Sequence, residues 1–355
     1  MQITHVEVIR QIVKLHKVFK ISFATVSQVE TLIVKVETDA GVTGYGECNP
    51  FEPVTGESIA TETVALTAFA AALKGADPTC IEHVHAVMDT VMLGHTAAKA
   101  GLDMACYDIL GKVAGLPVYK LLGGTSNTLT SDVTIGIESP DVMVADAKTW
   151  VAKGFSELKI KCGIDDAHDL AAIRAIRKAV GPDIDLRIDA NQAWTPKRAA
   201  RMMTALGDSV SAVEQPLPAG DLAAMPALRP LIGQEVMLDE SVHDARDAMR
   251  AVTIGATDII NIKLQKSAGL YGAQQINAVA EAAGVACMLG CMVETRLGLT
   301  AAAHFVAAHH NVRYADLDAF LDFEELPEIS GGFTNDGGVY TLLDKPGIGV
   351  TAPFN

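Results

Sequence analysis

The chain has 355 residues, 49% of them hydrophobic, and a formal net charge of −15 at pH 7. This length is enough for a well-buried core and for two domains. The acidic balance argues against nucleic acid as a partner, because phosphate binding requires a basic face. Arg10 and Lys14 interrupt the apolar N-terminal run, and no other run reaches the length of a membrane span. We therefore expect a cytoplasmic protein with no membrane partner.

The first third of the chain predicts an α+β domain. Alternating apolar residues predict two strands, and runs rich in alanine and leucine predict three helices. The strands cover Ile3 to Arg10 and Thr31 to Glu37, and the helices cover Ala60 to Leu73, Cys80 to Val91 and Ala97 to Ala114. We expect residues 1–122 to form this domain.

Beyond residue 122, short β-rich runs alternate with helical stretches, a pattern typical of βα units around a parallel sheet. The predicted strands are Thr130 to Ile137, Glu157 to Lys161, Asp185 to Asp189, Ser211 to Glu214, Val236 to Asp239, Asp258 to Lys263, Val285 to Leu289 and Val312 to Asp316. Eight such units predict an α/β fold of the (β/α)8 TIM-barrel type over residues 123–320. Residues 321–355 are rich in glycine, and we expect them to return to the N-terminal domain.

Three carboxylates stand at successive strand ends. Asp189, Glu214 and Asp239 end the third, fourth and fifth predicted barrel strands. The C-terminal ends of barrel strands form the active-site face, so these residues should lie in one acidic arc. Adjacent carboxylates repel each other unless a hard cation binds there, and all-oxygen ligands suit Mg²⁺, with Mn²⁺ as a substitute.

Two lysines flank this arc. Lys161 ends the second strand and Lys263 ends the sixth, which places them on opposite sides of the barrel mouth. A substrate held at the carboxylates would have one ammonium on each face. Lys159 shares a strand face with Lys161, so each should disfavour the other's charge and bring the pKa toward the range of about 7 to 8 that suits a base.

These motifs resemble the enolase superfamily, in its muconate-lactonizing subgroup. The likeness rests on Lys159-Ile160-Lys161, Asp189-Ala190-Asn191, Glu214-Gln215-Pro216, Asp239-Glu240-Ser241, Asn261-Ile262-Lys263 and the helical signature from Ala97 to Lys112. The resemblance implies a modified, enolase-like barrel with an α+β capping domain. It also implies Mg²⁺ as cofactor, Lys161 and Lys263 as catalytic bases, and Lys159 as an assisting group.

Within this family, the last barrel strand is similar to that of the dipeptide epimerases. Asp316 and Asp318 match the pair of carboxylates that holds the free α-ammonium of the substrate, and Thr134 is assigned to the same site. The resemblance therefore implies a Mg²⁺-dependent isomerase that inverts the α-carbon of the C-terminal residue of a dipeptide. Barrels of this family often assemble, so a homo-oligomer is compatible with the sequence.

The expected side-chain pocket departs from the best-known relatives. Those acting on Ala-Glu dipeptides place an arginine in the first capping loop, where this chain aligns Ala24. We therefore expect small or apolar substrate side chains, contacted by Phe23, Phe51 and Met292, instead of glutamate. Glu52 leaves room for a cationic side chain.

Other activities fit parts of the pattern. An N-acyl amino acid racemase or an o-succinylbenzoate synthase would use substrates without a free ammonium, which Asp316 and Asp318 argue against. A dehydratase of hydroxyproline-type substrates would also need an acid pair for the amine. A non-catalytic carboxylate-binding barrel would need only the metal and one cation, so it does not account for both Lys161 and Lys263.

Overall fold

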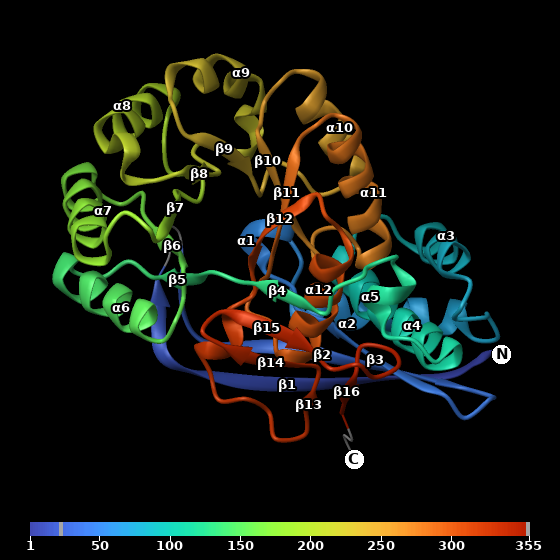
Figure 1. The fold of residues 1–355 in the computed structure, drawn as a ribbon. Coiled ribbons are helices and arrows are strands. Elements are labelled where there is room, and N and C mark those ends of the chain that lie inside the picture. Colours follow the sequence, from blue (N-terminus) through green and yellow to red (C-terminus); the bar gives the residue numbers. More distant parts are fainter. Residues whose placement is uncertain (21–23, 353–355) are drawn as a thin grey trace.

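The computed structural model describes residues 1–20 and 24–352, which form a barrel beside an N-terminal cap (Figure 1). Eight parallel strands lie in the spatial order β12-β11-β10-β9-β8-β7-β6-β5. Their bounds are β5 Val133–Ile135, β6 Glu157–Lys161, β7 Asp185–Asp189, β8 Ala212–Glu214, β9 Glu235–Leu238, β10 Ile259–Lys263, β11 Ala286–Gly290 and β12 Val312–Asp316. The backbone N–H of Asp132 donates to Ala315 O at 2.9 Å, which brings the two ends of the sheet together. The predicted barrel is confirmed.

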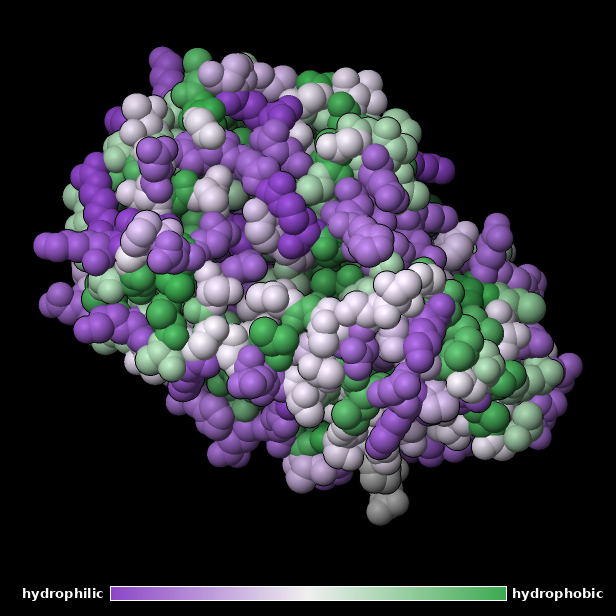
Figure 2. All heavy atoms as spheres, viewed as in Figure 1, coloured by the Kyte–Doolittle hydropathy of each residue, from purple (hydrophilic) through white to green (hydrophobic). Residues whose placement is uncertain are grey.

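The barrel helices alternate with the strands and pack around them. They are α6 Pro140–Ala152, α7 Asp166–Val180, α8 Pro196–Leu206, α9 Met225–Leu228, α10 Ala245–Thr253, α11 Leu270–Ala282 and α12 Arg296–Ala308. Several begin where a side chain caps the first turn: Asp165 accepts from His168 N, and Thr195 accepts from Arg198 N. On the face of the molecule seen in Figure 2, hydrophilic side chains are widespread and hydrophobic groups lie between them.

The cap combines an antiparallel sheet with helices, as the sequence predicts. It contains β1 Ile3–Lys20, β2 Thr25–Thr38, β3 Thr43–Cys48, α1 Glu52–Thr55, α2 Ile59–Leu73, α3 Ile81–Val91 and α4 Thr96–Ala114. The β1–β2 hairpin is longer than predicted, because its outer half carries polar residues that break the apolar alternation while Arg10 and Glu30 pair across the strands.

The third strand of this sheet, β3, lies directly against α4 and contains two glycines. A Cβ on Gly46 would lie 2.0 Å from Gly101 O, and one on Gly44 would lie 2.1 Å from Ala105 O. Glycine therefore lets β3 approach α4 more closely than any side chain would allow.

The C-terminal segment lies against earlier parts of the chain. Its strands are β13 Ser330–Gly331, β14 Phe333–Asp336, β15 Val339–Leu342 and β16 Val350–Thr351. β15 pairs with β4 (Thr128–Thr130), so the predicted strand from Thr130 to Ile137 divides between two sheets. Gly347 exchanges backbone hydrogen bonds with Leu116 and Val118, next to the short helix α5 (Val118–Leu121). The domain boundaries after residues 122 and 320 stay a prediction.

One buried apolar cluster spans cap and barrel, and a second cluster lies within the cap. Val13, Ile33 and Met104 of the cap belong to the same buried cluster as Leu158 and Ile260 of the barrel. Within residues 1–20 and 24–352, every helix is too short or too polar to cross a bilayer.

Candidate active site

The predicted polar residues meet at one end of the barrel. Lys161, Glu214 and Lys263 are the last residues of β6, β8 and β10, and Asp189 is the last residue of β7. Asp239 directly follows β9. Because these strands are parallel and adjacent, the five side chains share the C-terminal mouth, with Lys161 and Lys263 four strands apart.

Each of the three carboxylates has one oxygen anchored by a neighbouring donor. The Asn191 N–H donates to Asp189 Oδ1 at 2.8 Å, the Asn261 amide to Glu214 Oε1 at 2.7 Å, and the Lys266 ammonium to Asp239 Oδ1 at 2.5 Å. All three carboxylates are buried. Anchoring one oxygen fixes the direction of the other.

The second oxygen of each carboxylate faces a lysine of the mouth. Lys159 Nζ lies 3.2 Å from Asp189 Oδ2 and 2.8 Å from Glu214 Oε2, Lys161 Nζ lies 2.6 Å from Asp189 Oδ2, and Lys263 Nζ lies 2.8 Å from Asp239 Oδ2. Among the described residues, no three Asp, Glu, His or Cys side chains form a ready-made metal cluster. The carboxylates are ion-paired with the ammonium groups of these lysines.

The donor set nevertheless fits a hard divalent cation. Asp189, Glu214 and Asp239 each direct a carboxylate oxygen into the mouth, and carboxylate oxygens are ligands that Mg²⁺ prefers. Asp239 Oδ2 is buried and receives no well-directed hydrogen bond, although Lys263 is near. Burial, with Asp189 nearby, raises the pKa of Glu214 to about 7, and a bound cation would stabilise its charged form. Asp189, Glu214 and Asp239 could hold such a cation.

The expected lowering of lysine pKa values does not appear at Lys159. Burial opposes its charge, but Asp316, Glu214 and Asp189 outweigh burial and raise the pKa of Lys159 well above its usual range. The pKa of Lys263 is also raised, because Asp239 outweighs burial. The prediction relied on burial, a neighbouring ammonium and the metal, and it omitted the carboxylates that Lys159 contacts.

Asp316 and Asp318 lie beside this site, on β12 and the turn after it. Asp316 Oδ2 accepts from Lys159 at 2.8 Å, and Thr134 donates to both acids: Oγ1 to Asp316 at 3.3 Å and N–H to Asp318 at 2.5 Å. Asp318 has no ion-pair partner among the side chains that the structure describes. Burial and the neighbouring Asp316 raise its pKa well above the usual range. A cation brought by a ligand would stabilise its charged form.

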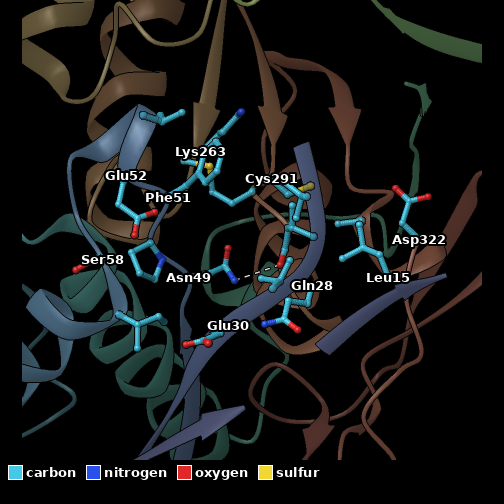
Figure 3. A pocket seen from close by; sticks show the side chains of 18 of the residues that line it. Leu15, Gln28, Glu30, Asn49, Phe51, Glu52, Ser58, Lys263, Cys291 and Asp322 are labelled. Carbon is cyan, nitrogen blue, oxygen red and sulfur yellow. Dashed lines mark hydrogen bonds between the residues drawn. The ribbon is translucent and has the colours of Figure 1, made fainter. Parts of the chain in front are cut away.

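A cavity of about 1010 Å³ connects these groups to the cap. Figure 3 shows Lys263 and Cys291 reaching it from the barrel, while Leu15, Gln28 and Glu30 reach it from the cap strands. Other cavity-lining residues include Thr25, Val26, Phe51, Glu52, Thr134, Met292, Val293, Asp316 and Asp318. Ala24 directly precedes Thr25, and Phe23 lies outside the described residues.

Buried polar groups join the cap to the barrel mouth, and sequence reasoning did not identify Gln265, which lies at their centre. Gln265 accepts from Asn49 N at 2.9 Å and donates to Glu47 O at 3.1 Å and to Glu294 Oε1 at 2.8 Å. Glu47 accepts from the N–H groups of Thr295, which caps α12, and of Gly298 in its first turn. These groups are far apart in the sequence, and no local pattern indicates that they meet.

Comparisons with known proteins agree with this geometry. Sequence models for the mandelate racemase / muconate lactonizing enzyme N-terminal domain and for the enolase C-terminal domain-like family match residues 3–123 and 142–353. The chain is 42% identical to the hydrophobic dipeptide epimerase of Enterococcus faecalis V583 over 99% of this chain and 100% of the relative. It is 41% identical to the L-Ala-D/L-Glu epimerase of Bacillus subtilis 168 over 99% of this chain and 97% of the relative.

A solved structure is equally similar. The crystal structure of the dipeptide epimerase from E. faecalis V583, complexed with Mg and the dipeptide L-Leu-L-Tyr, superposes with a TM-score of 0.97 at 43% identity, covering 99% of this chain and 100% of that one. The chain therefore belongs to the mandelate racemase / muconate lactonizing enzyme family of enolase-like proteins.

Proposed function

We propose that this protein is a Mg²⁺-dependent dipeptide epimerase that inverts the α-carbon of the C-terminal residue of its substrate. The observation that carries the proposal is the placement of Lys161 and Lys263 four strands apart around a mouth lined by three carboxylates. Full-length similarity to dipeptide epimerases supports the same activity.

The position of each residue at the barrel mouth suggests its role in the proposed reaction. Mg²⁺ held by Asp189, Glu214 and Asp239 would polarise the substrate carboxylate and so make the α-proton more acidic. The one of Lys161 and Lys263 that is present as a neutral amine accepts that proton at its Nζ, and the other, present as an ammonium, delivers a proton to the opposite face. Lys159 is buried and held cationic by its carboxylate neighbours, so it acts by stabilising negative charge near the substrate carboxylate.

Asp316 and Asp318 would bind the free α-ammonium of the N-terminal residue. Asp318 is buried beside Asp316 without a described cationic partner, and a substrate ammonium would supply one. This requirement disfavours N-acylated substrates, which carry no charge at that nitrogen.

The cavity favours apolar side chains over acidic ones. The described cations that line it are Arg10, Lys159, Lys161 and Lys263, and each is ion-paired with a carboxylate. Leu15, Val26, Phe51, Met292 and Val293 supply apolar surface, and Glu52 adds negative charge. We infer that apolar dipeptides are preferred, that a cationic side chain is tolerated near Glu52, and that a glutamate side chain is disfavoured. A cytoplasmic location and a homo-oligomeric state stay predictions from the sequence.

The proposal is tested by incubating pooled L,L-dipeptides with the protein and Mg²⁺ in D₂O and measuring mass by mass spectrometry. We expect a gain of one mass unit in a subset of apolar dipeptides. Absence of deuterium from every member of a broad pool would reject epimerase activity.

A further inference from the structure

Asp239 is held from two sides by lysines that differ in access. Lys263 lines the cavity and faces Asp239 Oδ2 at 2.8 Å. Lys266 faces Asp239 Oδ1 at 2.5 Å and is only 1% exposed. Lys263 is therefore placed to meet a ligand, whereas Lys266 is enclosed by protein.

The three hydrogens of the Lys266 ammonium all have acceptors. Besides Asp239 Oδ1, Nζ donates to Asp239 O at 2.5 Å and to Asn261 O at 3.1 Å. The Lys266 backbone N–H donates to Lys263 O at 3.0 Å, which closes a tight turn directly after β10. The ammonium thus has a fixed position between the ends of β9 and β10.

This anchor differs from those of the other two carboxylates. Asp189 Oδ1 is held by a backbone N–H and Glu214 Oε1 by the Asn261 amide, both neutral donors. A divalent cation at Asp239 Oδ2 would compete with the Lys263 ammonium for that oxygen. Lys266 binds the opposite oxygen, so it can keep the carboxylate in place when Lys263 turns to the substrate.

We propose that Lys266 is a positioning residue that orients Asp239 for divalent-cation binding. The inference rests on the proposed function, because it takes Asp239 as a metal ligand. Groups that hydrogen-bond a ligating carboxylate from outside typically contribute about 10–100-fold to metal affinity or activity. A charged donor with three bonds fits that role.

The test is calorimetric titration of MgCl₂ into the full-length protein without substrate. We expect Lys266→Met to bind Mg²⁺ about 10–100-fold more weakly than the unmodified protein. Lys99→Met is the matched control, because Lys99 is also buried and bonds Asp89 and Met92 O, but lies on α4 in the cap. It should leave Mg²⁺ affinity unchanged. Saturating Mg²⁺ should restore most of the turnover of Lys266→Met, which a general structural defect would not allow.

Thermal unfolding in EDTA checks that each variant is folded. If Lys266→Met does not fold, Lys266→Gln, which keeps an N–H donor but loses the charge, carries the same test and should also bind Mg²⁺ more weakly. Unchanged or tighter Mg²⁺ binding in the folded variant would overturn the role of Lys266. Absence of Mg²⁺ binding in the unmodified protein would instead reject the metal site of the proposed function.

Discussion

The side-chain amide of Asn261 on β10 donates to Glu214 Oε1 on β8 at 2.7 Å, past the intervening strand β9. Asn261 lies on β10 two residues before Lys263, so both side chains share the inner face of that strand. One strand therefore presents a proposed base and also orients a proposed metal ligand. A displacement of β10 would disturb both functions together.

Replacing either proposed base should abolish epimerisation. Lys161→Ala and Lys263→Ala each remove the acid–base group on one face, so we expect a loss of at least about 100-fold in the rate of inversion. Chiral chromatography of a dipeptide substrate measures this rate. Mg²⁺ binding should persist in both variants, because the three carboxylates are unchanged.

The control is Lys120→Ala, which removes an exposed lysine paired with Asp344. It should epimerise at the normal rate. Retained epimerisation in either Lys161→Ala or Lys263→Ala would exclude the two-base scheme.

Asp318→Asn should weaken recognition of the substrate ammonium. We expect kcat/KM for a free dipeptide to fall about 100-fold, within the range for loss of one partner of a buried charge pair. Steady-state kinetics with the free and the N-acetylated dipeptide measure the change, and the preference for the free amine should shrink. Asp344→Asn, at an exposed ion pair, is the control. An unchanged preference in Asp318→Asn would remove Asp318 from the amine site.

Ala24→Arg should admit acidic side chains. A guanidinium next to Thr25, which lines the cavity, can pair with a glutamate side chain, and a charged hydrogen bond contributes about 1.5–3 kcal/mol. We expect the ratio of kcat/KM for Ala-Glu to that for Ala-Leu to rise at least about tenfold. Ala24→Leu adds bulk without charge and should not raise this ratio. If both variants behave alike, charge at residue 24 does not determine specificity.

His304 should make the folded state sensitive to acid. Tyr119 N donates to its Nδ1, its Nε2 donates to Ile348 O, and burial lowers the pKa of His304 from 6.5 to about 4. The unfolded chain therefore takes up a proton at a higher pH than the folded protein. The contribution to stability is intact above pH 6.5 and declines as pH falls toward 4, by about 3 kcal/mol in total.

Urea unfolding at pH 7.5 and pH 5 measures this effect. His304→Gln can keep both hydrogen bonds without titrating, so it should lose less stability between these pH values than the unmodified protein. The exposed His310→Gln is the control and should keep the full pH dependence. Equal losses in His304→Gln and the unmodified protein would contradict the assignment.

Much of the fold could be predicted because its signals are local. The barrel strands are apolar runs that end in polar residues, and the predicted helix from Ala97 to Ala114 differs from α4 by one residue. The prediction of one continuous strand from Thr130 to Ile137 was wrong, because residues 128–130 pair with β15, which lies near the C-terminus. The local sequence pattern contains no information about such a distant partner.

The candidate site was also predicted only in part from the sequence. Strand ends placed Asp189, Glu214 and Lys263 correctly at the mouth, since barrel geometry fixes where parallel strands finish. Gln265 and Lys266 were missed, because their importance depends on partners that only folding brings together. A second lysine, three residues after Lys263, was the available signal.

The most direct test follows one apolar dipeptide, such as L-Leu-L-Tyr, by NMR in D₂O with Mg²⁺ and with EDTA. We expect deuterium to enter the α-carbon of the C-terminal residue only, the L,D diastereomer to accumulate, and EDTA to stop both. Exchange at the N-terminal residue, exchange without Mg²⁺, or an unsaturated product in place of the diastereomer would exclude the proposed epimerisation.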